Sequence, residues 1–165
     1  MTIRINAATS ADIPDILASA NALVAVDAGS YDAAATDLGW ADTTGISYCT
    51  SLLGSDDNLV LLARDRDEVV GHLVARLRGP GAVHPIRVAD LESIHVYPRH
   101  RNRSVGEQLM TAFLLWAAKK GAARATVTAY AANYGAQRFY ARHGFAVKSV
   151  IMDLDDLPAP PDHAH

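Results

Sequence analysis

Hydrophobic residues alternate with polar ones in several short segments of the chain, and this period of two predicts β-strands. The first alternation begins with Ile3 and Ile5. A polar turn at residues 64–68 separates two further apolar segments, so we expect a hairpin there. The segments expected to form strands are residues 3–5, 59–63, 69–78, 88–96, 125–130 and 145–154.

Other segments have the helical period of 3.6 residues. Thr9 and Ser10 offer N-caps to the first helix, and Gly121 offers a left-handed stop to the third. The third helix has an apolar stripe that consists of Val105, Leu109, Ala112, Phe113 and Trp116. The expected helices are residues 12–24, a less regular region within 29–54, residues 105–120 and residues 133–143.

The order of these elements is strand, two helices, three strands, helix, strand, helix and one or two final strands. We therefore expect an α/β fold with a mixed, mostly antiparallel sheet of six or seven strands flanked by four helices. The chain of 165 residues has no linker, so we expect one domain over residues 1–157 and a disordered Pro-rich tail at residues 158–165. In the fourth strand, strict alternation places on one face Asp90, Glu92, Ile94 and Val96.

The net charge of −3 conceals an uneven distribution of charged residues. No Lys or Arg occurs between Arg4 and Arg64. The acidic residues of this region are Asp12, Asp15, Asp27, Asp32, Asp37, Asp42, Asp56 and Asp57. Any single Asp is explained by a helix cap or a solvated face, but the whole set predicts two surfaces of opposite potential.

Composition excludes several classes of protein. No apolar run reaches the roughly 20 residues of a membrane span, and the N-terminus lacks the layout of a signal peptide. Cys49 is the only cysteine, and we interpret it as a small buried hydrophobe of a cytoplasmic protein. The net acidic charge argues against nucleic-acid binding. No metal site is expected, because only His163 and His165 are closely spaced and they lie in the tail.

The most informative segment joins the fourth strand to the following helix. Arg99, Arg101 and Arg103 precede the helix start, where unpaired backbone N–H groups favour a phosphate. Gly106 removes a side chain from the first turn, where ligand oxygens would approach. This combination predicts a diphosphate site.

The same segment has a purely structural interpretation. Ser104 and Glu107 match a capping box, in which both side chains hydrogen-bond to backbone N–H groups of the first turn. Three arginines also occur in ordinary solvated loops. The residues of this segment alone do not decide between the two interpretations.

A second segment favours the diphosphate site. Residues 133–145 read Asn-Tyr-Gly-Ala-Gln-Arg-Phe-Tyr-Ala-Arg-His-Gly-Phe and resemble the C-terminal motif N-x-x-A-x-x-F-Y-x-x-x-G-F of the GNAT superfamily of N-acetyltransferases. Residues 101–106, Arg-Asn-Arg-Ser-Val-Gly, resemble the acetyl-CoA motif of that family, Q/R-x-x-G-x-G/A. Residues 91–96 are similar to the preceding strand of the family. The order of elements also matches, up to about Leu154.

The resemblance implies an acyltransferase with acetyl-CoA as co-substrate. The same resemblance implies that the N–H of Ile94 stabilises the oxyanion and that the backbone of Val96 pairs with the pantetheine arm. Asn133 meets the same arm or only caps its helix. Ser104 replaces the first glycine of the family motif, which leaves open an acyl-CoA-binding module without turnover. The residues implied in coenzyme binding are Ile94, Val96, Arg101, Asn102, Arg103, Ser104, Val105, Gly106 and Asn133.

The resemblance also implies two catalytic side chains. Glu92 is our candidate general base, because an alkylamine with a pKa near 10.4 is mostly protonated at pH 7. Asp90 is the alternative base, and pairing with Arg76 would make Glu92 structural. Tyr140 is implied as the acid that protonates the thiolate, and we expect it also to position the sulfur because a phenol is a weak acid. Its alternative role is to fill space beside Phe139.

The acceptor is expected to lie against the acidic N-terminal third. We therefore predict a primary amine of a cationic small molecule as the acceptor. A peptide or protein N-terminus or lysine is the alternative acceptor. The oligomeric state is left open, with a homodimer as one arrangement.

Overall fold

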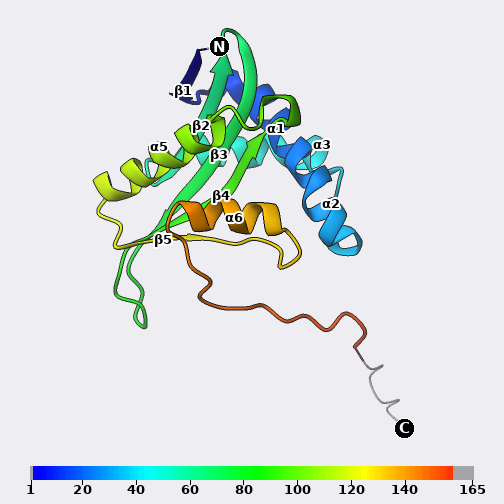
Figure 1. Cartoon of the computed structure of the whole chain (residues 1–165), viewed down its shortest axis with the longest axis vertical. Coiled ribbons are helices and arrows are strands. Elements are labelled where there is room, and N and C mark those ends of the chain that lie inside the picture. The colour runs from blue at the N-terminus through cyan, green and yellow to red at the C-terminus, as the bar shows by residue number, and fades with distance from the viewer. Residues whose placement is uncertain (1, 158–165) are drawn as a thin grey trace.

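The computed structural model describes residues 2–157, which form one mixed sheet with helices on both faces (Figure 1). The strands are β1 (Ile3–Ala7), β2 (Asn58–Asp65), β3 (Glu68–Arg78), β4 (Val88–Val96) and β5 (Arg124–Val127). They lie side by side in sequence order. The strands β1 to β4 are antiparallel, whereas β4 and β5 are parallel. The expected mixed, mostly antiparallel sheet is thereby confirmed.

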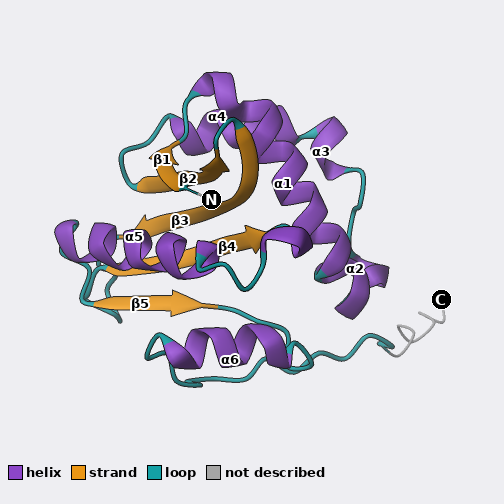
Figure 2. Cartoon of the chain, turned by 45° about the horizontal axis from the view of Figure 1, so that its top comes forward, coloured by secondary structure: helices purple, strands orange, loops and turns teal. Residues whose placement is uncertain are grey.

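Helices cover the sheet from both sides (Figure 2). α1 (Ile13–Val26) and α4 (Gly45–Leu53) pack on one face, and α5 (Val105–Lys119) packs on the other. α5 also makes the crossover that a parallel pair of strands requires. The shorter helices are α2 (Ala28–Tyr31), α3 (Trp40–Thr43) and α6 (Tyr134–Arg142). The less regular region expected within residues 29–54 corresponds to α2, α3 and α4.

Two hydrophobic clusters form the core, one on each face of the sheet. Leu109 and Phe113 of α5 are fully buried in one cluster, as their helical spacing predicts. Ile16 of α1 and Leu52 of α4 are buried in the other. Cys49 lies in this second cluster with no exposed surface, which confirms its interpretation as a buried hydrophobe, and burial raises the pKa of its thiol.

A β-bulge interrupts β4. The ladder between β3 and β4 passes directly from the pair Val74–Ser93 to the pair Ala75–Leu91. Glu92 therefore has no opposing residue on β3 and is the extra residue of the bulge.

The bulge changes which side chains share a face of β4. Ile94 and Val96 pack with Leu91 against the core beneath α5. Glu92 instead contacts Tyr48 of α4, on the other side of the sheet. The prediction that four side chains share one face of β4 is therefore wrong, because strict alternation cannot include the extra residue of a bulge. The four residues are Asp90, Glu92, Ile94 and Val96.

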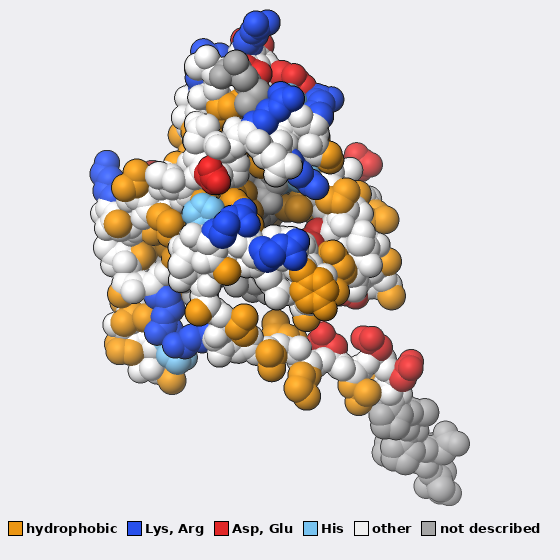
Figure 3. All heavy atoms as spheres, viewed as in Figure 1, with side chains coloured by type: hydrophobic (Ala, Val, Ile, Leu, Met, Phe, Trp, Pro, Cys, Tyr) orange, Lys and Arg blue, Asp and Glu red, His pale blue; other side chains and the backbone are white. Residues whose placement is uncertain are grey.

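The sheet has fewer strands than the sequence predicts. Residues 145–154 are expected to form a final strand, but residues 145–157 have no strand partner within the described chain. An alternating pattern becomes a strand only where another strand completes its hydrogen bonds. This segment leads away from the sheet (Figure 1) and extends from the body of the molecule in the space-filling view (Figure 3). Large apolar side chains are consequently exposed there: Val147, Val150, Ile151, Met152, Leu154 and Leu157. The expected count of six or seven strands and the expected order are therefore wrong, and the predicted tail at 158–165 lies outside the described residues.

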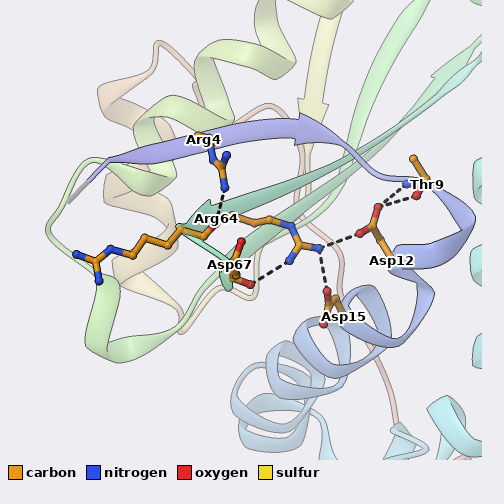
Figure 4. Close-up of polar contacts among 7 residues, drawn as sticks. Arg4, Thr9, Asp12, Asp15, Arg64 and Asp67 are labelled. Carbon is orange, nitrogen blue, oxygen red and sulfur yellow. Dashed lines mark hydrogen bonds and ion pairs between the residues drawn. The ribbon is translucent and has the colours of Figure 1, made fainter.

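A cluster of charged side chains fixes the start of α1 to the end of β2 (Figure 4). Nη2 of Arg64 lies 2.8 Å from Oδ1 of Asp12 and 2.9 Å from Oδ2 of Asp15. The backbone N–H of Thr9 donates to the other oxygen of Asp12 at 2.7 Å. This backbone bond lowers the pKa of Asp12, and Arg64 contributes to the same direction. Two of the aspartates expected near the acceptor thus have a structural role.

The variant Arg64→Met is expected to lower the free energy of unfolding by about 1–2 kcal/mol, because it leaves two carboxylates without their cation. Met retains the aliphatic stem, so the loss reports mainly on the ion pairs. Urea unfolding at pH 7 measures it, with the exposed Arg138→Met as the matched control. Equal stability of the two variants would contradict the proposed role of Arg64.

Candidate functional site

The strand β4 has an open edge. β5 pairs with β4 only from Val88 to Leu91. From Glu92 to Val96, the edge of β4 toward β5 has no strand partner within residues 2–157. An open edge of this kind offers backbone N–H and C=O groups to an extended ligand. Ile94 and Val96, which are both predicted to bind the coenzyme, lie in this open half of β4.

The loop after β4 contains two residues in the left-handed conformation. Asn102 and Ser104 both have φ of 58°. Asparagine tolerates this conformation, but it costs a serine roughly 1–3 kcal/mol, so the surrounding structure holds Ser104 against its local preference. Left-handed residues alternating with right-handed ones turn successive N–H groups toward one side and form anion-binding concavities. Both residues belong to the predicted diphosphate site.

The backbone N–H groups at the start of α5 have no hydrogen-bond partner within residues 2–157. The side chain of Ser104 makes no capping hydrogen bond, so the capping-box interpretation is wrong. The first bond of the helix runs from the N–H of Gln108 to the carbonyl of Ser104 at 3.0 Å. The N–H groups without a partner among the described residues include those of Ser104, Val105, Gly106 and Glu107.

The arginines of the loop differ in what they contact. Arg99 pairs with Glu68 at the start of β3. Nε of Arg101 donates to the backbone oxygen of Val96 at 3.0 Å, at the end of the open edge. Arg103 borders a hollow beside the turn between β2 and β3. A guanidinium has five donors, so the bond of Arg101 to the strand is compatible with a second bond to a phosphate.

Gly106 makes room for another part of the protein. A Cβ at this position would lie 3.3 Å from Cε2 of Phe139 on α6 and 3.8 Å from Cγ2 of Val96. The missing side chain therefore allows α6 to approach the start of α5. Packing against Phe139 is thus one reason for this glycine, and the other, space for ligand oxygens, stays a prediction; its backbone N–H is part of the unpartnered set.

Glu92 accepts hydrogen bonds on both carboxylate oxygens. Nε of Arg76 donates to Oε2 at 2.5 Å, and the hydroxyl of Tyr48 donates to Oε1. Burial raises the pKa of Tyr48, and the bond to Glu92 adds to this effect. Glu92 thus pairs with Arg76, which is the structural alternative that the sequence analysis gives for this residue. The side chain of Glu92 is still 35% exposed and each oxygen has a second lone pair, so water can reach it.

Asp90, the alternative base, lies in the paired half of β4. Its Oδ1 accepts a hydrogen bond from the hydroxyl of Thr126 on β5 at 2.8 Å. Its Oδ2 lies 3.6 Å from Nε of Arg78. Asp90 therefore links β4 to β5, whereas Glu92 lies where the two strands part.

Tyr140 lies on α6 among aromatic rings. Its ring centroid is 5.6 Å from that of Phe139 and 6.0 Å from that of Phe145. Burial, with the nearby carboxylate of Asp27, raises the pKa of Tyr140 to about 12. Its hydroxyl has no hydrogen-bond partner among residues 2–157. The phenol is thus protonated at neutral pH and available as a donor.

Asn133 is the N-cap of α6, in agreement with the alternative given by the sequence. Its Oδ1 accepts from the N–H of Ala136 at 3.0 Å, and its Nδ2 donates to Oδ1 of Asp27 at 2.9 Å. A contact with the coenzyme stays a prediction.

Sequence reasoning missed the contact of Tyr48 with Glu92 and the position of Asp27 beside α6. No periodicity connects Tyr48 to a residue on a strand that follows much later in the chain. Asp27 does have a signal: it is the C-cap of α1, where a carboxylate meets the negative end of the helix dipole. An unfavourable charge at such a position indicates another role.

None of the helices in residues 2–157 is both long and apolar enough to span a membrane. Over the same part of the chain, no three His, Cys, Asp or Glu side chains are grouped so that they could hold a metal ion.

The sequence matches a family model, that of the acetyltransferase (GNAT) family, over residues 28–145. No curated protein has a sequence that matches this chain.

Solved structures share its fold at low sequence identity. The aminoglycoside N-acetyltransferase AAC(6')-Iy, solved with a bisubstrate analogue of CoA, is 17% identical with a TM-score of 0.71, and the match covers 96% of this chain and 100% of that one. A transcriptional regulator from Bacillus halodurans is 19% identical with a TM-score of 0.74, covering 94% and 100%. A ribosomal-protein-alanine N-acetyltransferase from Brucella melitensis is 15% identical with a TM-score of 0.66, covering 93% and 100%.

Proposed function

Because the chain belongs to the acetyltransferase (GNAT) family, we propose that it transfers an acetyl group from acetyl-CoA to a primary amine of a cationic small molecule. Membership of the family makes it an acyltransferase. The observation that supports the coenzyme most directly is the set of unpartnered N–H groups at the start of α5. They follow the open edge of β4 after only a short loop.

The proposed coenzyme site runs along this edge and loop. The diphosphate accepts hydrogen bonds from the N–H groups of residues 104–107, where the helix dipole is positive. Guanidinium groups of Arg101 and Arg103 add charge-assisted bonds. The pantetheine arm pairs with the backbone of Ile94 and Val96, as an added strand would. Asn102 and Asn133 complete the proposed set.

The proposed reaction begins with a protonated amine. Glu92, acting directly or through a water molecule, takes one proton from the ammonium group, and the nitrogen lone pair then attacks the thioester carbon. The N–H of Ile94 stabilises the resulting oxyanion. The oxyanion collapses to the amide carbonyl as the C–S bond breaks, the sulfur leaves as a thiolate, and the nitrogen releases its second proton to solvent.

Tyr140 is proposed to act mainly as a hydrogen-bond donor to the departing sulfur. Full proton transfer from a phenol of pKa about 12 to a thiolate whose conjugate thiol has a pKa near 8.5 is unfavourable by about 5 kcal/mol. A hydrogen bond stabilises the developing negative charge without this cost. Solvent can protonate the thiolate later.

The charge near α6 supports a cationic acceptor. Asp27 contacts Asn133 and raises the pKa of Tyr140, which places a carboxylate close to the proposed reaction. Asp32 is near enough to Tyr130 to raise its pKa further than burial alone. One solved structure of this fold is an aminoglycoside N-acetyltransferase, and aminoglycosides are cationic amines.

Thermal shift with acetyl-CoA and with free CoA, followed by a thiol-release screen over amines of different charge, tests the proposal. We expect both coenzyme forms to raise the melting temperature, and cationic amines to give the fastest release. Arg103→Ala is expected to weaken coenzyme affinity about tenfold, and Arg87→Ala, directly before the start of β4 and bonded to the carbonyl of Lys120, serves as its matched control. No shift with either coenzyme would refute the coenzyme site, and faster turnover of neutral or acidic amines would refute the acceptor class.

A further inference from the structure

Four polar side chains form a continuous hydrogen-bonded chain between α1 and the sheet. Oγ of Ser19 lies 2.7 Å from Nδ1 of His72 and 3.1 Å from Nδ1 of His95. Nε2 of His72 lies 3.0 Å from Oγ of Ser93. Ser19 and His72 have no exposed surface, and His95 has almost none. The proposed chemistry uses none of these side chains.

Each bond in this chain depends on the others. The hydroxyl of Ser19 has one proton, so it donates to one imidazole and accepts from the N–H of the other. Both rings are neutral, because burial lowers the pKa of His72 to about 3 and that of His95 to about 4, with smaller effects of His95 on His72 and of Arg101 on His95. Removal of Ser19 would therefore leave two buried imidazole nitrogens without partners.

The chain reaches β4 on both sides of Ile94. Ser93 and His95 are its two neighbours in the strand, and they lie in the half of β4 that β5 does not pair with. A strand segment with one open edge, next to a bulge at Glu92, has fewer backbone bonds to hold its position. The side-chain bonds to α1 and β3 supply a restraint at this point.

We propose that Ser19 and His72 are positioning residues that fix the backbone N–H of Ile94 for oxyanion stabilisation. The inference rests on the proposed function, in which this N–H is the oxyanion donor. Such a donor is effective only within about 2.7–3.1 Å of the oxyanion, so a small displacement of the strand weakens it. Neither Ser19 nor His72 needs to contact the substrate.

Amide hydrogen exchange measured by NMR tests the restraint without any substrate. Ser19→Ala is expected to raise exchange about tenfold for those N–H groups of residues 93–96 that bond to β3, while residues 88–91, which β5 also pairs with, keep their rates. The matched control is Ser47→Ala, which removes an exposed helix hydroxyl bonded only to the carbonyl of Thr44. Ser93→Ala breaks the chain at its half-buried end and is expected to give the same selective pattern, should Ser19→Ala fail to fold.

Kinetics on an amine that the wild-type protein acetylates tests the positioning role. Ser19→Ala is expected to lower kcat about tenfold and to raise KM for acetyl-CoA by a smaller factor, since the strand that pairs with the pantetheine arm loosens but the loop that binds the diphosphate is not part of the chain. Ser19→Thr, which retains the hydroxyl, is expected to restore part of the loss.

Two results would overturn the inference. One is a rise in exchange that is equal across residues 88–96, because it would indicate general destabilisation. The other is a selective rise with unchanged kcat. If the wild-type protein acetylates no amine, the proposed function fails and the catalytic part of the inference fails with it. A selective rise in exchange would still support the restraint in that case.

Discussion

Glu92→Gln is expected to lower kcat by about 10²-fold at pH 7, because an amide cannot take a proton from the amine. The geometry should survive the change: the amide oxygen can still accept from Arg76, and the amide N–H group can donate to the oxygen of Tyr48. KM for acetyl-CoA is therefore expected to stay nearly constant. The loss of rate should narrow toward pH 9–10, where more of the amine is already deprotonated.

Initial rates of thiol release between pH 6 and 10 measure this effect. The matched control is Asp90→Asn, which removes a carboxylate two residues away that bonds to Thr126 and lies near Arg78. We expect this control to retain most of its activity. A larger loss in Asp90→Asn than in Glu92→Gln would assign the base to Asp90, and normal rates of Glu92→Gln across the pH range would exclude Glu92 as the base.

A decrease in pH from 7 to 5 is expected to reduce the free energy of unfolding by about 4 kcal/mol, about 2 kcal/mol for each of His72 and His95. Burial lowers the pKa of both imidazoles in the folded protein, to about 3 and about 4. The unfolded chain, with a histidine pKa near 6.5, therefore binds more protons than the folded chain between these values and pH 6.5. The contribution of these two histidines to the free energy of unfolding is fully present above pH 6.5 and is lost as the pH falls toward 4.

Urea unfolding at pH 7, 6 and 5 measures this dependence. His72→Gln and His95→Gln are each expected to remove about half of the pH dependence, whatever their effect on stability at pH 7. His84→Gln is the matched control, because His84 is exposed. An unchanged pH dependence in the double variant of His72 and His95 would show that other groups cause the acid sensitivity.

Periodicity predicted those elements whose partners are fixed by local patterns. The strands β1 to β4 and the helices α1, α5 and α6 lie where alternation and helical spacing place them. The bulge at Glu92 was not predictable, because it depends on the register of β4 against β3. The prediction of a final strand was wrong for a related reason. Residues 145–154 have the alternating pattern of a strand, but pairing requires a neighbouring strand that no local pattern specifies.

The candidate site shows the same division. Motif spacing located the loop and α6, and it placed Ser104 and Tyr140 on the correct elements. Spacing did not indicate that Arg101 bonds to the end of β4, or that Gly106 accommodates Phe139. These contacts join elements that are distant in sequence, so they follow from how the helices dock on the sheet.

The burial of Cys49 makes the protein well suited to assays that titrate sulfhydryl groups with a coloured disulfide reagent. Such reagents react with an accessible thiolate, whereas Cys49 has no exposed surface and a raised pKa. As it is the only cysteine of the chain, the folded enzyme should contribute almost no background. High enzyme concentrations can then be used to detect slowly acetylated acceptors. The thiol of Cys49 itself reacts with the reagent only when the chain unfolds.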